Sequence, residues 1–293
     1  MSDAQALSDA QVETLCASSL AKFEKLKATF AGFDSVLVAF SGGVDSALVL
    51  AVAHQVLGSK ALALTAISAS VSADEANDAR ALAQKIGAEH VCVNSNELND
   101  PRYAANPQNR CYFCKTELYT LCEAERQKRG LAAVVDGFNA DDKKDHRPGH
   151  QAALEHQVRS VLAEAGLTKN EVRAWSKRMG LPTWDKPQMA CLASRLPYGV
   201  AVTAERLSQV ERAEHALRGL GFKYFRVRHH NDVARLELGV DEHRLLNDDA
   251  LRQTVDKAIK ATGYTFVAVD LEPFRSGRLN DMLKQKSLSL PVV

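Results

Sequence analysis

A glycine-rich loop after a short apolar run is the feature that most constrains the fold of this 293-residue chain. Residues 35–40 (Ser-Val-Leu-Val-Ala-Phe) predict a buried parallel strand, because such strands are continuous runs of apolar, β-prone residues. The loop Ser41-Gly42-Gly43-Val44-Asp45-Ser46 follows at once and leads into the helix-prone residues 47–57. Backbone N–H groups at a helix start favour a bound anion, and glycines let phosphate approach the backbone closely. The loop therefore predicts a phosphate site, with hydroxyl donors from Ser41 and Ser46.

The same residues exclude two common nucleotide-binding loops. The Gly-Lys-Ser/Thr ending of a Walker loop is missing, and so is the Gly-x-Gly-x-x-Gly of dinucleotide-binding folds. A tight strand-to-helix turn with incidental glycines is the alternative interpretation. The placement of the hexapeptide between a strand and a helix favours the phosphate site.

The first part of the chain alternates short strands with helices, which predicts a doubly wound α/β domain with a parallel sheet. We assign this domain to residues 1–198 and a smaller α+β domain to residues 199–293, because the pattern changes after Pro197-Tyr198-Gly199. The polar stretch 141–150 predicts an exposed, mobile loop. In the first domain we expect helices at 9–31, 47–57, 74–86 and 115–129 and strands at 35–40, 61–67, 90–94 and 132–135. In the second we expect helices at 203–217 and 248–261 and strands at 222–230, 233–238 and 264–271.

Composition removes several classes of protein. Apolar residues make up 46% and charged residues 25%, the balance of a soluble globular protein. Lys plus Arg exceed Asp plus Glu by 37 to 36, so the net charge of +1 gives no reason to expect a nucleic-acid partner. No apolar run approaches the roughly 20 residues of a membrane span, and no signal peptide is visible. Six cysteines are too few for a disulfide scaffold, so we expect a reducing, cytoplasmic setting.

Cys191 is the candidate nucleophile. It lies in Met-Ala-Cys-Leu-Ala-Ser-Arg (residues 189–195), where small neighbours leave room for a ligand near the sulfur. Ser194 would supply a hydroxyl donor, and the fixed positive charge of Arg195 would favour a thiolate and attract an anionic substrate. The alternative is a buried cysteine that packs as a small hydrophobic residue.

The Cys111-x-x-Cys114 pair leaves three interpretations open. A structural zinc site needs four ligands, and no second Cys-x-x-Cys completes one. A redox pair is the second interpretation, although the flanking sequence is not where such a pair is expected. In the third, Cys191 joins the pair to give three thiolates for an iron–sulfur cluster with one open iron that could hold sulfide. Cys16, Cys92 and Cys122 fall within helix or strand patterns and are predicted core residues.

Arginines gather in the second domain. Arg226 and Arg228 share one face of a predicted strand by its period of two, and Arg275 follows another strand. Guanidinium groups bind carboxylates and phosphates bidentately, so converging arginines suit a small anionic substrate. A solvated basic face with surface salt bridges is the alternative.

Ser41–Ser46 resembles the pyrophosphate loop of the ATP pyrophosphatases, which cleave ATP between its α and β phosphates. The resemblance implies an adenine nucleotide alpha-hydrolase-like fold that uses ATP with Mg²⁺. It places Asp45 on the metal side or the phosphate side of the loop. Adenine would lie over the strand ends near residues 65–68, which include Ser68.

The motifs together resemble the ATP-dependent sacrificial sulfur transferases of nickel-pincer nucleotide synthesis, the LarE family. The resemblance covers residues from about 35 to 280. The matching segments are Ser41–Ser46, Arg110–Lys115, Asp136–Asp142 with Arg147–Gly149, Ala190–Gly199, Arg226–His230 with Ala234 and Arg235, and Leu271–Asn280.

The family resemblance implies a defined reaction. One carboxylate of a pyridinium dicarboxylate mononucleotide is adenylated and then attacked by sulfur at Cys191, which gives a thiocarboxylate. It implies that Ser194, Arg226 and Arg228 bind the substrate, that Glu214 and Glu237 serve a metal or positioning role, and that the protein is a homo-oligomer. In the sacrificial version Cys191 ends as dehydroalanine.

A second branch of the family carries three cysteines and a [4Fe–4S] cluster. Because this chain has the three, the resemblance favours sulfur held on a cluster, with the sacrificial route as the alternative. Two other functions compete with the sulfur transferase. A tRNA thiolase of the pyrophosphate-loop type would need a basic RNA-binding surface, and a non-catalytic ATP-binding protein would leave the cysteines and arginines without a role.

Overall fold

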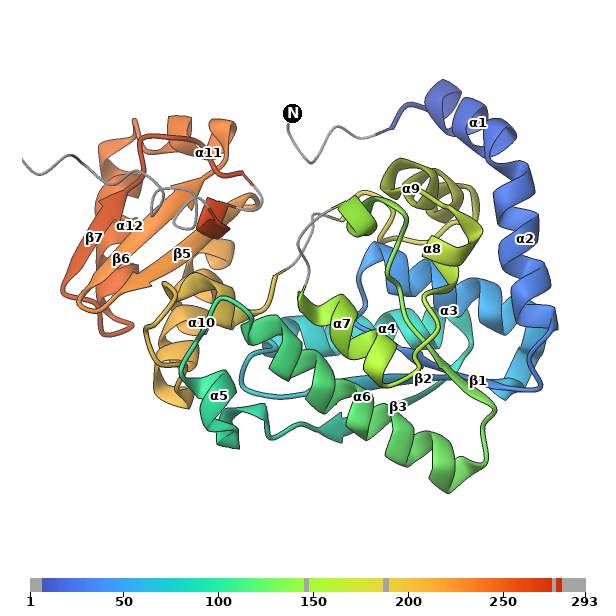
Figure 1. Ribbon diagram of the computed structural model, residues 1–293. Coiled ribbons are helices and arrows are strands. Elements are labelled where there is room, and N and C mark those ends of the chain that lie inside the picture. The colour runs from blue at the N-terminus through green and yellow to red at the C-terminus, as the bar shows by residue number, and fades with distance from the viewer. Residues whose placement is uncertain (1–6, 145–147, 187–189, 276–277, 281–293) are drawn as a thin grey trace, which may run out of the picture. The chain divides into compact units, whose positions relative to one another are not determined.

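The computed structural model describes residues 7–144, 148–186, 190–275 and 278–280. They divide into two compact units (Figure 1), which we call the N-terminal unit (described residues 7–186) and the C-terminal unit (described residues 190–280). The division at residue 190 lies ahead of residue 199, where the sequence places the start of the second domain.

The N-terminal unit is built on a parallel sheet of four strands in the order β3-β2-β1-β4. All four residues of β1 are buried, as expected for a central parallel strand covered on both faces. In register, Leu37 lies beside Leu62 on one side and Val134 on the other. The strands are β1 (Val36–Ala39), β2 (Ala61–Ile67), β3 (Glu89–Asn94) and β4 (Ala133–Val135).

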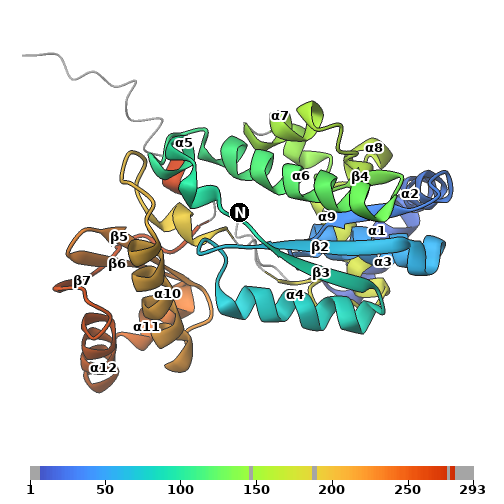
Figure 2. The same ribbon diagram turned by 90° about the horizontal axis from the view of Figure 1, so that it is seen from below.

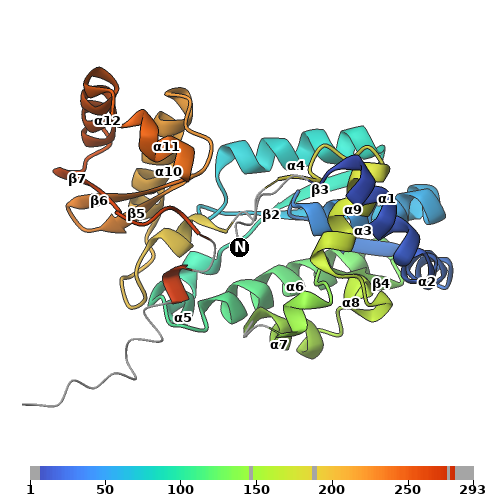
Figure 3. The same ribbon diagram turned by 90° about the horizontal axis from the view of Figure 1, so that it is seen from above.

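Helices cover both faces of this sheet, which confirms the predicted doubly wound α/β class. The β1 residues Val36 and Val38 pack into one apolar cluster with α3, and Leu37 packs into another with Tyr119 of α6. Figures 2 and 3 both show α4 and α6 on opposite sides of β2 and β3. The helices of the unit are α1 (Asp9–Ser18), α2 (Leu20–Ala31), α3 (Val44–Leu57), α4 (Ala73–Ile86), α5 (Pro101–Ala104), α6 (Arg110–Arg129), α7 (Pro148–Glu155), α8 (Val161–Ala165) and α9 (Lys169–Arg178), with short 3-10 turns at Gly58–Lys60, Glu97–Asn99 and Asp141–Lys144.

Capping residues explain several helix ends. Ser72 and Glu75 form a capping box at the start of α4, and Gly130 ends α6 in the left-handed conformation, as its position predicts. The single helix expected over 9–31 is two helices, α1 and α2. They separate at Ser19, whose hydroxyl donates to Leu15 O (2.5 Å) and accepts from the indole of Trp175 (2.9 Å).

The prediction of an exposed loop at 141–150 is wrong for its described ends. Residues 141–144 form a 3-10 turn and α7 begins at Pro148. Asp142 is buried, and its carboxylate accepts the backbone N–H of Asn139 (3.1 Å). The ring of His150 stacks on Phe138. Residues 145–147 lie outside the described residues.

The C-terminal unit is the predicted α+β arrangement, a sheet of three strands in the order β5-β6-β7. β5 and β6 are antiparallel, β6 and β7 are parallel, and α10 and α12 share an apolar cluster with Val227 and Leu236. Successive side chains of a strand point to opposite faces of the sheet, so Arg226 and Arg228 lie on the face opposite to Val227 and the apolar cluster. The elements are η4 (Leu192–Arg195, a 3-10 turn), α10 (Ala204–Gly219), β5 (Phe225–His230), β6 (Val233–Leu238), α11 (Val240–Leu245), α12 (Asp249–Lys260), β7 (Phe266–Val269) and η5 (Arg278–Asn280).

Within the part of the chain that the structure describes, no helix combines the length and apolar character needed to cross a membrane.

Candidate functional site

The glycine loop connects β1 to α3 as predicted, and it presents the start of a helix. Gly42 has φ +69°, a conformation that side chains disfavour, and Gly43 occupies the N-cap position of α3 without a side chain to cap it. The first N–H groups of a helix have no partner within the helix itself. Their direction and the helix dipole make this turn suited to bind phosphate oxygens.

The two loop serines bond to each other. The Ser46 hydroxyl lies 3.1 Å from that of Ser41, accepts the Ser41 N–H (3.2 Å) and donates to Gly43 O (3.2 Å). Ser46 is buried, whereas Ser41 is exposed. Ser46 therefore stabilises the loop through its buried hydrogen bonds to the loop backbone. Ser41 is the serine that a ligand can reach.

Close backbone contacts fix the loop against two neighbouring segments. A Cβ on Gly42 would lie 3.1 Å from Cα and Cβ of Ala79 in α4. A Cβ on Gly137, just after β4, would lie 2.8 Å from the backbone nitrogen of Ser46. Only glycine lets the backbone at position 137 lie this close to Ser46 without a shift. Gly137 therefore helps to set the shape of the loop. Gly137 lies in the segment 136–142 that carries the family resemblance, but no sequence pattern distinguishes it from an ordinary loop glycine.

Asp45 is held by two residues that the sequence analysis missed. Its carboxylate accepts from the Asn139 amide (3.1 Å) and from the ammonium group of Lys169 at the start of α9 (2.5 Å). The backbone N–H of Lys169 also donates to Asp141 (2.9 Å). Asn139 follows a strand end, where ligand-binding residues are expected. Lys169 carries no local signal, because it is 124 residues from Asp45.

Ser68 lies directly after β2, and its hydroxyl bonds to a buried carboxylate. It donates to Glu97 (2.7 Å), which also accepts from Ser95 (2.6 Å), and it accepts the N–H of Ser70 (3.1 Å). Thr65 in the same strand donates to Phe40 O (2.7 Å) and so ties β2 to the end of β1. The adenine position predicted from the sequence therefore lies at the ends of β1 and β2, which hydrogen bonds join to each other and to Glu97.

Cys111 and Cys114 occupy the first turn of α6, which begins five residues before the predicted helix start at 115. At a spacing of three they are neighbours on one face, and Cys111 is exposed while Cys114 is half-buried. The first turn holds no acidic residue, and Asn109 at the N-cap makes no side-chain bond to it. A helix N-terminus of this kind stabilises thiolates. Across the described residues, no three Cys, His, Asp or Glu side chains gather into a metal-binding group. Of the three cysteines predicted in the core, Cys16 and Cys122 are buried, but Cys92 is exposed because β3 is an edge strand of the sheet.

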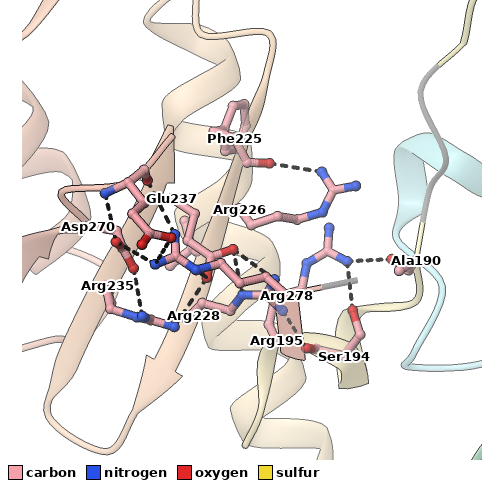
Figure 4. Close-up of polar contacts among 12 residues, drawn as sticks. Ala190, Ser194, Arg195, Phe225, Arg226, Arg228, Arg235, Glu237, Asp270 and Arg278 are labelled. Atoms are coloured by element: carbon pink, nitrogen blue, oxygen red, sulfur yellow. Dashed lines mark hydrogen bonds and ion pairs between the residues drawn. The ribbon is translucent and has the colours of Figure 1, made fainter. Parts of the chain in front are cut away.

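Cys191 lies in the C-terminal unit, at the N-cap of η4. It is half-buried, and its carbonyl accepts the N–H of Ser194 (2.9 Å). The Arg195 guanidinium donates to the Ala190 carbonyl and to the Ser194 hydroxyl (3.1 Å), as Figure 4 shows. It also donates to the Cys191 carbonyl (3.2 Å). Its other side pairs with both oxygens of Glu214 at 2.8 and 2.9 Å.

The Arg195–Glu214 pair is almost fully buried, with side-chain exposures of 1% and 2%. Burial alone would raise the pKa of Glu214, but the charge and hydrogen bonds of Arg195 outweigh it, so the pKa is lower than usual. Glu214 also accepts the backbone N–H of Val227 in β5 (3.1 Å). The carboxylate predicted for a metal or positioning role is therefore bound to a guanidinium and to the sheet.

A network of arginines and carboxylates covers the other face of β5 and β6 (Figure 4). Arg228 donates to Glu237 (2.7 Å) and to Ser194 O (2.7 Å), and Arg235 bridges Glu237 (3.1 Å) and Asp270 (2.6 Å). Arg278, which lies in the segment 271–280 that matches the family, donates to Asp270 at 2.7 Å. Glu237 is fully buried among these cations.

Arg226 and Arg275 complete the set of predicted substrate residues. Arg226 donates to Phe225 O (2.8 Å) and lies over the ring of Phe274, 4.9 Å from its centre. Arg275 is exposed. Arg228 and Arg235 pair with Glu237, Arg235 and Arg278 pair with Asp270, and Arg278 also pairs with Glu272 at 3.3 Å (Figure 4). Together with Arg226, these guanidinium groups suit an anionic ligand.

The fold and the loop define a pyrophosphate-loop α/β enzyme of the ATP-utilising class. The family model described as NAD synthase matches residues 17–109, which contain the loop. The chain is 46% identical to an uncharacterized protein of Synechocystis sp., over 89% of this chain and 98% of that protein.

A relative with a named activity defines the family more narrowly. The chain is 37% identical to the pyridinium-3,5-bisthiocarboxylic acid mononucleotide synthase of Lactiplantibacillus plantarum, over 90% of this chain and 95% of that protein. It is 26% identical to the tRNA-specific 2-thiouridylase MnmA of Desulforamulus reducens, over 52% of this chain and 53% of that protein. The chain therefore belongs to the LarE family and is a sulfur transferase of the pyrophosphate-loop class.

Proposed function

We propose that the protein adenylates a carboxylate of pyridinium-3,5-dicarboxylate mononucleotide and converts it to a thiocarboxylate, a step in nickel-pincer nucleotide synthesis. The observation that carries the proposal is the turn formed by residues 190–195 (the Cys191 turn), which Arg228 of the arginine-rich strand β5 contacts through Ser194 O. The chain also matches a curated bisthiocarboxylate synthase over 95% of that protein's length. A thiol and a cationic face in one unit suit sulfur transfer to an anionic substrate.

Adenylation is assigned to the N-terminal unit. The substrate carboxylate attacks the α-phosphorus of ATP, and pyrophosphate leaves into the loop, where the N–H groups around Gly42 and Gly43 and the Ser41 hydroxyl would bind it. Mg²⁺ would offset phosphate charge, and Asp45 is its candidate ligand. Lys169 already lies against Asp45, so Mg²⁺ would share this carboxylate with an ammonium group. Ser68 borders the expected adenine position.

Sulfur transfer is assigned to Cys191. In the sacrificial route the Cys191 thiolate attacks the acyl carbon and AMP leaves, which gives a thioester. Loss of the Cys191 Cα proton then breaks the Cβ–S bond, so the electron pair stays on sulfur. The products are a thiocarboxylate and dehydroalanine, and no oxidant or reductant is needed. Small residues around Cys191 leave room for this chemistry.

The catalytic route would use a [4Fe–4S] cluster, which supplies a site for exogenous sulfide. Cys111 and Cys114 fit two of its ligands, because they are neighbours in an exposed to half-buried helix turn that itself contains no acidic residue. Cys191 is the proposed third ligand. Among the three interpretations of the cysteine pair, this one gives every candidate cysteine a role.

Substrate binding is assigned to the other face of β5. Arg226 and Arg228, with Ser194 and Arg275, would bind the phosphate and the free carboxylate of the nucleotide. Glu214 and Glu237 stay weaker predictions as metal ligands, because guanidinium groups already lie against both carboxylates. We also expect a homo-oligomer.

One experiment tests the function and the sulfur source. The protein is purified without oxygen, its visible spectrum is recorded, and intact mass is measured before and after reaction with ATP, Mg²⁺, sulfide and the pyridinium nucleotide. A cluster band, repeated turnover and unchanged mass support the cluster route. A mass loss of one H₂S per chain supports sacrifice. Absence of thiocarboxylate in every condition contradicts the proposal.

A tRNA thiolase is the second candidate, favoured by the similarity to the 2-thiouridylase over about half of this chain. The same preparation is incubated with unmodified tRNA in place of the nucleotide. Thiolated tRNA without any reaction of the pyridinium nucleotide would favour this candidate.

A further inference from the structure

The Cys191 turn is fastened by a buried ion pair whose parts come from distant segments. Arg195 lies four residues after Cys191, and Glu214 lies on α10. One edge of the guanidinium, Nε and Nη2, bonds to both Glu214 oxygens, and Nη1 faces the carbonyls of Ala190 and Cys191 and the Ser194 hydroxyl. A planar group with a fixed set of donors can bond to both partners at once, which an ammonium group cannot.

The environment of Arg195 is unlike that of a substrate ligand. Its side chain is 1% exposed, and its charge is balanced by a carboxylate that is itself 2% exposed. Arg226, by contrast, is half-buried on the other face of β5, with its guanidinium over the ring of Phe274. Glu214 therefore neutralises the charge of Arg195 inside the C-terminal unit.

The ion pair also connects the turn to the strand that carries the substrate arginines. Glu214 accepts the backbone N–H of Val227, and Arg228 on the same strand donates to Ser194 O. The backbone of Cys191 and the strand β5 are therefore joined through Arg195 and Glu214 from one side and through Arg228 from the other. A displacement of the guanidinium would move the sulfur relative to β5.

We propose that Arg195, through its pair with Glu214, is a positioning residue that fixes Cys191 for sulfur transfer and does not itself bind the substrate. This inference rests on the proposed function for its kinetic consequence, and it replaces our sequence-based expectation of Arg195 as a substrate ligand. Positioning matters because a shift of about 1 Å in a reacting group can cost about 100-fold in rate.

The test compares Arg195→Lys with Arg212→Lys. The first keeps the positive charge beside Glu214 but removes the fork of donors. The second alters an exposed arginine on α10 that donates to Ser208 and Thr262 O and, among the described residues, forms no hydrogen bond with the Cys191 turn. For Arg195→Lys we expect the saturating single-turnover rate of thiocarboxylate formation to fall about 100-fold. The half-saturating nucleotide concentration and the ATP–pyrophosphate exchange rate should stay within about twofold of the wild type.

Two kinetic results would contradict the proposal. A raised half-saturating concentration with an unchanged saturating rate would make Arg195 a substrate ligand. An equal loss of rate in Arg212→Lys would show a general loosening of the unit instead of a specific effect on Cys191.

Hydrogen exchange of the wild-type protein gives a test that needs no turnover. The amides of Ser194 and Leu196 bond to Cys191 O and Ala193 O, so in a fixed turn they should exchange within about tenfold of the β5 amides. Exchange as fast as in an open loop would contradict the proposal, even if Arg195→Lys failed to fold. Slow exchange in a protein that forms no thiocarboxylate would overturn the proposed function and leave the fixed turn intact.

Discussion

The phosphate loop and the Cys191 turn are two short segments of similar size, and they are held in place by different forces. The loop depends on backbone geometry: Gly42 adopts φ +69°, and Gly137 approaches the Ser46 nitrogen where no Cβ fits. The turn depends on charge, because Arg195 binds it from within and Glu214 neutralises Arg195. The loop should therefore be sensitive to added atoms, and the turn to the loss of a charged partner.

The largest expected effect tests the charged side of this comparison. Arg195→Ala removes the two-point partner of the buried Glu214, for which Arg218 at 3.7 Å is a weaker substitute, so we expect the free energy of unfolding of the C-terminal unit to fall by about 3–5 kcal/mol. The free energy of unfolding of each unit is measured in urea, with hydrogen exchange of peptides from that unit as the signal. Arg252→Ala is the control, because its pair with Asp249 is exposed and should change stability by less than about 0.5 kcal/mol. Similar losses in both variants would contradict the account.

The second effect tests the backbone side. Gly137→Ala places a methyl group against the start of α3, so we expect a loss of about 1–3 kcal/mol in the N-terminal unit together with weaker ATP binding. Isothermal titration with ATP and Mg²⁺ measures the binding. A Cβ on Gly219 meets nothing within 4 Å, and Gly219→Ala should leave both quantities near their wild-type values. Unchanged ATP affinity in Gly137→Ala would show that the close approach does not shape the loop.

The smallest effect concerns pH. Because the pKa of Glu214 is lowered in the folded protein, the unfolded chain binds more protons below the ordinary glutamate pKa of 4.5. The stabilisation is fully present above pH 4.5 and is lost as the pH falls through the lowered folded-state value. Glu214→Gln should flatten this acid loss, by less than about 1.4 kcal/mol per pH unit. Urea unfolding at several values between pH 3 and 6 measures it, and equal slopes in both proteins would contradict the assignment.

The sequence predicts what depends on local pattern. The apolar run before Ser41 predicts β1, the alternation of strands and helices predicts the α/β class, and Gly130 ends a helix where expected. The exposed loop expected near Asp142 was wrong, because a polar sequence gives no sign that its side chains will bond to Asn139 and become buried.

Long-range partners explain the rest of what sequence analysis missed. Lys169 meets Asp45 across 124 residues, and Glu214 meets Arg195 through the packing of α10 against η4. Arg195 has the residue type of an anion ligand, and only its buried carboxylate partner favours a different role. A single sequence contains the charges but not their pairing.

The most direct measurement of the central claim is the reaction of Cys191→Ala with ATP, Mg²⁺ and the pyridinium nucleotide, in the presence of sulfide. Pyrophosphate exchange and thiocarboxylate formation are followed on the same sample. The account predicts that exchange persists, because the loop is untouched, and that no thiocarboxylate forms, because both sulfur routes need Cys191. Wild-type thiocarboxylate formation by Cys191→Ala would contradict it.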